Sequence, residues 1–259
     1  MTIYTLPIGL FLALFWGSFV FWRLLHQSAR YNEFEIFDAL IWSTLGGIII
    51  GRAVHLSWHF EQFGDWHTWF DIIHYPGFSM FFCVIAASFF FWRYLAHLKI
   101  TDLELLDYWV RGLSCTLIIY YLSLFIDGSG SGYLVASWLG FPLEKTGLYL
   151  FPAPLVGASF YFLVSFLLEY LEKNYRTYTW YRANRSQAKT GFVFFTFLLI
   201  YGVYSLVSLV FQPPVFRRFG HSWDWLWAVI LIVTDITLLW LHALAARRQR
   251  KPNKKVNKK

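Results

Sequence analysis

Seven long apolar segments dominate the sequence and restrict what the chain can fold into. Each holds about 20 mostly apolar residues, the length that an α-helix needs to cross the hydrocarbon core of a bilayer. The segments cover residues 6–25, 36–58, 76–97, 105–126, 149–171, 191–211 and 223–245. Only 14% of the 259 residues are charged, whereas soluble domains average roughly 25%. The sequence therefore predicts an all-α, polytopic integral membrane protein with seven transmembrane helices, and it disfavours a soluble enzyme.

The basic residues predict how these helices are oriented. If the N-terminus lies outside, 17 of the 22 Lys and Arg residues fall in segments that remain inside, and only three fall outside. Since positive charge is retained on the cytoplasmic side, we expect an outside N-terminus and a cytoplasmic C-terminus. The chain then divides into a membrane domain, 1–246, and a basic tail, 247–259. We expect this tail to contact anionic lipid, and we expect no nucleic-acid partner.

Ionisable residues inside apolar helices are costly, so those that occur are candidates for function. Arg52 follows the glycines of the Gly46-Gly47-Ile48-Ile49-Ile50-Gly51 segment. Its guanidinium could receive the phosphate of a lipid that enters sideways, or it could pair with Asp235 of the seventh segment and hold the bundle together. Asp235 would otherwise be protonated. The small residues before Arg52 favour close helix packing and would also allow a lipid to approach.

Histidines and a glycine-rich turn supply further candidates near the outer surface. His55 and His59 lie four residues apart on one helical face, and acidic residues and His74 follow, so a metal- or haem-binding protein is one alternative. The sequence lacks the Glu of a metalloprotease helix, and the predicted sites include no metal and no cofactor. Asp127 and Gly128 begin a turn after the fourth segment that could fold closely around a headgroup.

Several local motifs share an order and spacing with a known family. They are Leu6-Pro7-Ile8-Gly9, Phe37-Asp38-Ala39-Leu40, Gly51-Arg52, Pro76-Gly77-Phe78-Ser79, Leu105-Leu106-Asp107, Asp127-Gly128, Phe151-Pro152 and Tyr201-Gly202. In these features the chain resembles the bacterial prolipoprotein diacylglyceryl transferases, seven-helix enzymes with an outside N-terminus. The resemblance implies a multi-pass protein of the bacterial plasma membrane, expected as a monomer. Its implied reaction moves diacylglycerol from phosphatidylglycerol to the lipobox cysteine of a prolipoprotein.

The resemblance also implies roles for particular residues. Arg52 would hold the lipid phosphate, with Gly51, Asp127 and Gly128 completing the substrate site. His55 or His74 would serve as the base that yields the thiolate. The family's catalytic motifs align with other residue types in this chain: its His-Gly-Gly with Phe81, Phe82 and Cys83, two arginines with Tyr121 and Ser205, and a later histidine with Phe151. A relative that binds lipid or lipoprotein precursor without catalysing transfer is therefore the second hypothesis.

Overall fold

The computed structural model describes residues 5–28, 30–60, 69, 77–101, 103–142, 149–174, 190–218 and 221–248. Within these ranges the chain forms seven long helices and two small sheets. The helices are α1 (Thr5–Ser28), α2 (Glu33–Trp58), α4 (Met80–His97), α5 (Glu104–Asp127), α6 (Ala153–Glu172), α8 (Phe192–Ser208) and α9 (Asp224–Arg248).

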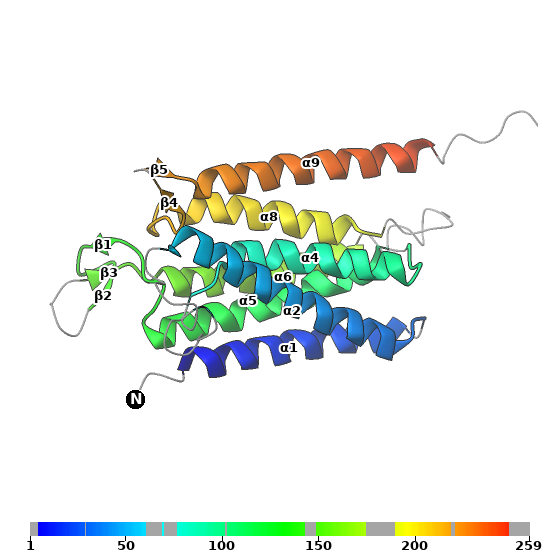
Figure 1. Ribbon diagram of the computed structural model, residues 1–259, viewed down its shortest axis with the longest axis horizontal. Helices are drawn as coiled ribbons and strands as arrows, with labels where there is room; N and C mark the ends of the chain where they lie inside the picture. Colours follow the sequence, from blue (N-terminus) through cyan, green and yellow to red (C-terminus); the bar gives the residue numbers. More distant parts are fainter. Residues whose placement is uncertain are drawn as a thin grey trace, which may run out of the picture.

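The helices lie side by side along the long axis of the molecule and alternate in direction (Figure 1). Because their number is odd, the chain begins at one end of the bundle and leaves at the other. We call the end that carries the N-terminus and the strands the outer end, and the end where α9 finishes the inner end, after the predicted orientation.

Six of these helices are long and apolar enough to cross a membrane, which confirms the prediction of an all-helical membrane protein. α8 has 17 residues. At ~1.5 Å per residue it is about 25 Å long, at the lower limit for a span. The seventh span and the orientation therefore remain predictions. The observed helices match the predicted segments within four residues at each end, and the largest differences are the late starts of α4 at Met80 and α6 at Ala153.

Residues just before α6 form a strand where the sequence predicts the start of a helix. β1 (Leu134–Val135), β2 (Phe141–Pro142) and β3 (Tyr149–Leu150) pair antiparallel in the order β1-β3-β2. A second antiparallel pair joins β4 (Arg217–Arg218) to β5 (His221–Ser222). Both sheets lie at the outer end of the bundle (Figure 1). The apolar run 149–152 was thus wrongly assigned to a membrane helix, because its backbone pairs with neighbouring strands instead.

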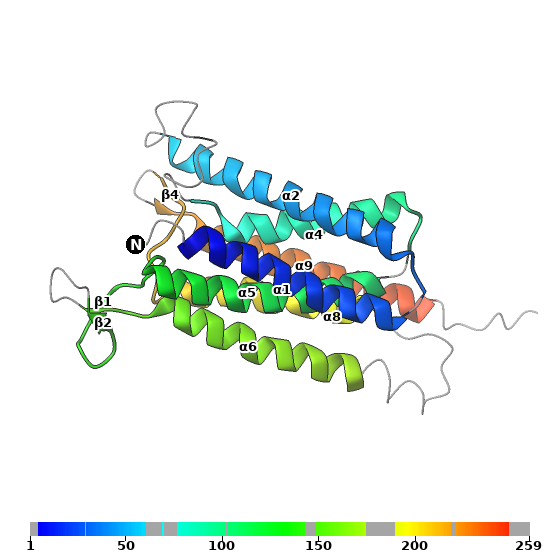
Figure 2. The same ribbon diagram turned by 90° about the horizontal axis from the view of Figure 1, so that it is seen from below.

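Helix packing follows pairs of helices rather than one closed ring. α1 packs mainly on α5, α2 on α4, α6 on α5, and α9 on α8. Figure 2 shows α2 and α4 together on one side of the bundle and α6 on the other, with α5 between them. Small residues allow these approaches: a Cβ built on Gly17 would lie 2.8 Å from the carbonyl oxygen of Gly112. Such contacts are typical of membrane helices, where close van der Waals packing replaces the hydrophobic effect.

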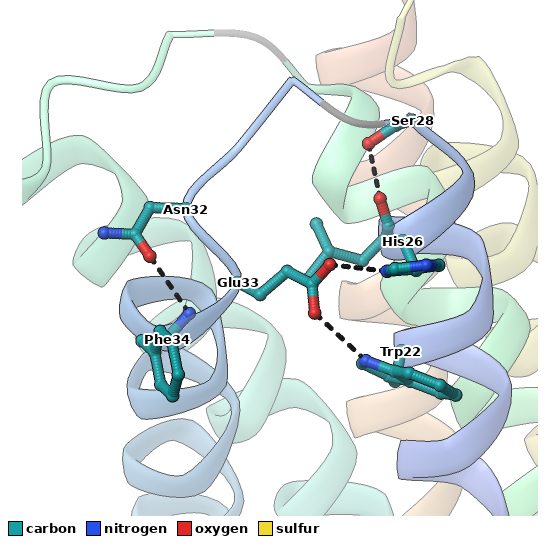
Figure 3. Close-up of polar contacts among 7 residues, drawn as sticks. Trp22, His26, Ser28, Asn32, Glu33 and Phe34 are labelled. Atoms are coloured by element: carbon teal, nitrogen blue, oxygen red, sulfur yellow. Dashed lines mark hydrogen bonds and ion pairs between the residues drawn. The ribbon is translucent and has the colours of Figure 1, made fainter.

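The connection between α1 and α2 is fixed by polar contacts at the inner end (Figure 3). Trp22 donates its indole N–H to Glu33 Oε2 over 3.1 Å, and His26 Nδ1 lies 2.7 Å from Glu33 Oε1. Asn32 caps α2 by accepting a hydrogen bond from the backbone N–H of Phe34 at 3.2 Å. Because Glu33 also lies in the first turn of α2, its negative charge interacts favourably with the positive end of the helix dipole.

The N-terminus of α8 is capped by a side chain from another helix. Asp107 of α5 is 2% exposed. Its Oδ2 accepts a hydrogen bond from the Gly191 N–H at 2.7 Å, and its Oδ1 accepts one from the Phe194 N–H at 2.8 Å. Two of the backbone donors that every helix start leaves unpaired are therefore satisfied across the bundle, which ties α8 to α5.

Candidate functional site

A polar cavity lies in the outer half of the bundle, where α4 and α9 begin and α5 and α8 end. We call it the outer cavity; its volume is about 330 Å³. Its polar lining consists mainly of hydroxyl groups and comprises Ser79, Tyr120, Tyr121, Ser131, Tyr201, Tyr204, Ser205, Ser208, Gln212 and Asp224.

Helical spacing explains why so many hydroxyls converge here. Tyr201, Tyr204, Ser205 and Ser208 of α8 are three or four residues apart, so they share one face of that helix. That face meets α5, where the ring of Tyr121 lies edge-on to the ring of Tyr204 with centroids 6.1 Å apart. Polar residues at this spacing in an otherwise apolar helix are the signal that could have identified the cavity from the sequence.

Two residues of the cavity wall, Tyr204 and Trp227, each carry a buried polar group without a hydrogen-bond partner among the described residues. The buried indole N–H of Trp227 makes no hydrogen bond to any described residue. Buried polar groups in proteins are almost always hydrogen-bonded, and an indole N–H can only donate. An occupant that supplied an acceptor oxygen at this point would satisfy the donor.

The cavity wall carries little charge. Among the described residues that line it, only Asp224 carries a carboxyl group, and none is a Lys, Arg or His. The Asp224 carboxylate accepts hydrogen bonds from the backbone N–H groups of Val215 and Phe216, at 3.0 and 2.9 Å. It thereby fixes the preceding loop onto the start of α9, where a negative charge is favoured. The arrangement suits a neutral group rather than an anion.

An apolar groove adjoins this cavity inside the bundle. We call it the membrane groove; it has a volume of about 60 Å³ and is lined by α1, α2, α4 and α5. Phe78 and Met80 line both spaces. Almost all other residues of the groove are apolar, among them Leu10, Leu14, Phe21, Leu40, Ile48, Val84 and Leu113. A polar space near the outer end thus borders an apolar one deeper in the membrane domain.

Arg52 lies outside both spaces. It is 7% exposed, and its guanidinium donates to two backbone carbonyls, that of Trp69 from Nε at 3.1 Å and that of Gly77 from Nη1 at 2.5 Å. The suggested pair with Asp235 does not form, since neither carboxylate oxygen of Asp235 has a hydrogen-bond partner among the described residues. Arg52 instead holds the segment before α4 against α2.

The predicted bases are not brought to the cavity. The His55 ring stacks on the His59 ring with centroids 4.4 Å apart, and it packs against Gly77. His55 does not line the outer cavity. His74 lies outside the described residues. Within the described part of the chain, no three His, Cys, Asp or Glu residues are grouped as a metal site would require.

The remaining predicted residues have structural contacts. Gly51 packs on α4, and its carbonyl accepts a hydrogen bond from the Ser79 N–H at 3.0 Å, which agrees with the packing interpretation. Asp127 is the last residue of α5, and Gly128 ends that helix with φ of 73°, a left-handed conformation that glycine adopts readily. Neither residue lines the cavity, although Gly130 and Ser131 of the same turn do.

Of the positions that the resemblance aligns with the family's catalytic motifs, three line the cavity, whereas Phe82, Cys83 and Phe151 do not. Phe81, Tyr121 and Ser205 all belong to its lining. In this chain they provide a phenyl ring and two hydroxyls where the family has a histidine and two arginines.

The fold and these spaces together define a class of protein: an all-helical membrane protein with a hydroxyl-lined cavity near one end and an apolar groove beside it. A comparison with known protein families and with curated proteins found no match to the chain. Its function is therefore inferred from the geometry.

Proposed function

We propose that the protein binds one diacyl lipid, with the glyceryl headgroup in the outer cavity and the first part of an acyl chain in the membrane groove. The observation that carries this proposal is the contact of the two spaces at Phe78 and Met80. An amphipathic ligand needs a polar and an apolar compartment side by side, and these two residues form part of the wall of both.

The lining favours a neutral, hydroxyl-bearing headgroup. The Tyr121 hydroxyl can donate and accept, and the Trp227 N–H can donate to an ester carbonyl. The Ser205 hydroxyl donates to the Tyr201 carbonyl at 2.8 Å and can still accept. A phosphate would find no cation in the described lining and would face the Asp224 carboxylate. Diacylglycerol therefore fits this wall better than phosphatidylglycerol does.

The same lining supports binding without transfer. Moving a diacylglyceryl group from phosphatidylglycerol to a cysteine requires a base for the thiol and cations for the phosphate leaving group. The described residues of the cavity supply no cation, and the carboxylate of Asp224 already accepts hydrogen bonds from the Val215 and Phe216 N–H groups. A diacylglyceryl transferase acting on a prolipoprotein remains the second candidate function, favoured by the alignment of Phe81, Tyr121 and Ser205 with the family's catalytic positions. In either case we place the protein in a bacterial plasma membrane, with its basic tail on anionic lipid.

Lipid binding to the purified full-length protein tests the proposal. Fluorescent diacylglycerol and fluorescent phosphatidylglycerol would be titrated separately in detergent, and we expect tighter binding of diacylglycerol. Trp227→Phe should weaken diacylglycerol binding about three- to tenfold, the value of one neutral hydrogen bond. Trp225→Phe is the matched control, since Trp225 is 53% exposed on the same helix and does not line the cavity.

Two results would contradict this proposal. Equal losses in the Trp227→Phe and Trp225→Phe proteins would show that the ligand does not contact the cavity wall. Labelled diacylglyceryl groups appearing on a lipobox peptide, when phosphatidylglycerol is supplied, would establish the transferase instead.

A further inference from the structure

A second groove lies between α2 and α4 near the inner end of the bundle, far along both helices from the outer cavity. We call it the Arg93 groove. Its volume is about 530 Å³, and its lining consists of Trp42, Ser43, Leu45, Gly46, Ile49, Phe90, Arg93, Tyr94 and His97. The lining is mostly apolar and aromatic, with a cationic side chain near the inner end of α4.

The sequence spacing shows that the groove is built from one face of each helix. The lining residues of each helix are separated by the three- and four-residue steps of a helical face. They are positions 42, 45, 46 and 49 of α2 and positions 90, 93, 94 and 97 of α4. Gly46 leaves the floor open between them: a Cβ built there would lie 2.6 Å from Cδ2 of the Phe90 ring. The depression therefore depends on the absence of a side chain at position 46.

This face is uncovered in the described structure. Trp42 is 63% exposed and Ile49 is 65% exposed, although both lie in helices that can cross a membrane. Such side chains meet lipid, and Trp and Tyr favour the depth of the headgroups. Trp42 and Tyr94 both lie toward the inner end of the groove, as expected if that end reaches the interface.

The charge of the groove is unbalanced. Arg93 is exposed and makes no ion pair with any described residue. No acidic residue belongs to the groove lining, and the acid closest along α2, Asp38, lies one turn beyond Trp42. A guanidinium beside hydrocarbon requires a counter-charge or water, so an anionic headgroup suits this position.

We propose that the Arg93 groove binds one anionic phospholipid of the leaflet at the inner end. The Arg93 guanidinium donates paired hydrogen bonds to the phosphate, a geometry that suits Arg better than Lys. An acyl chain then lies over Gly46 against Leu45, Ile49 and Phe90. A helix from a second copy would cover the apolar face but would leave Arg93 without a counter-charge, so the charge favours lipid. This site differs from the outer cavity in its position and in the charge of its ligand.

Native mass spectrometry of the detergent-purified full-length protein tests this site. Phosphatidylglycerol and phosphatidylcholine with identical acyl chains would be added separately, and the lipid-bound fractions measured. We expect Arg93→Gln to weaken phosphatidylglycerol binding about tenfold, the value of a charge-assisted hydrogen bond, with little effect on phosphatidylcholine. Arg23→Gln is the matched control, because Arg23 is an exposed arginine near the inner end of α1 that lines none of the cavities described here.

A photoreactive phosphatidylglycerol with the reactive group on its acyl chain locates the lipid. We expect crosslinks in the peptides that hold Leu45 to Ile49 and Phe90, and we expect Arg93→Gln to remove them. The Trp227→Phe change in the outer cavity should leave these crosslinks intact, which separates the two sites. Three results would each overturn the proposal. They are equal losses of phosphatidylglycerol binding in the Arg93→Gln and Arg23→Gln proteins, crosslinks confined to other helices, and a dimer that Arg93→Gln dissociates.

Discussion

Replacing Asp107 with asparagine should destabilise the protein through the start of α8. Both carboxylate oxygens of this buried side chain accept hydrogen bonds from α8, at 2.7 and 2.8 Å from the Gly191 and Phe194 nitrogens. An asparagine has nearly the same shape, but its NH₂ group would replace one acceptor and point a donor at a backbone N–H. One bond would be lost and the other would lose its charge.

The expected magnitude follows from these two bonds. A hydrogen bond to a charged group contributes about 1.5 to 3 kcal/mol, and loss of a helix N-cap costs about 0.5 to 2 kcal/mol. We therefore expect the free energy of unfolding to fall by about 2 to 3 kcal/mol. For a chain of this size, ~1 kcal/mol lowers Tm by roughly 2–4 °C, so the decrease in Tm should be about 4 to 12 °C.

Thermal unfolding in detergent and amide hydrogen exchange measure this effect. Asp38→Asn is the control for the chemical change, because Asp38 is an exposed aspartate of α2 that is not part of this cap. In the Asp107→Asn protein we expect faster exchange at the amides of Gly191 and Phe194, which the control should leave unchanged. A Tm equal to that of the control, or unaltered exchange at these two amides, would refute the capping role.

Three further substitutions test other parts of the structure. Gly47→Val should lower the free energy of unfolding by about 1 to 3 kcal/mol, because a Cβ at Gly47 would lie 2.8 Å from the Cys83 carbonyl oxygen and push α2 away from α4. The control is Ala53→Val on the exposed face of α2, which should unfold at the wild-type temperature. Asp235→Leu should raise Tm, because it removes a 1% exposed carboxylate that makes no hydrogen bond to the described residues. Leaving such a buried group without a partner costs about 1 to 3 kcal/mol of stability. A lower Tm would mean that this carboxylate has an essential partner. Arg52→Lys should speed amide hydrogen exchange in the residues just before α4, because one ammonium group cannot reproduce both contacts of the guanidinium with backbone carbonyls. If this variant instead bound phosphatidylglycerol more weakly with unchanged amide exchange, the result would support phosphate binding by Arg52.

The sequence by itself determined the helices and their order. A membrane span can be recognised from local composition. Its length must match the thickness of the bilayer, and its backbone N–H and C=O groups must form hydrogen bonds within the same segment. The segment predicted at 105–126 is the helix Glu104–Asp127, for example. The apolar run before Ala153 was assigned wrongly, because composition does not show whether a backbone pairs along a helix or with a neighbouring strand.

Only the tertiary structure decided the candidate site. An arginine in an apolar helix identified Arg52 as important, but its partners are backbone carbonyls, which have no sequence signature. Tyr121 and Ser205 are far apart in the chain and meet because α5 and α8 pack together, with Asp107 helping to hold that contact. Composition specifies each helix separately, whereas a binding cavity is a property of the space between helices, and that space depends on which faces come into contact.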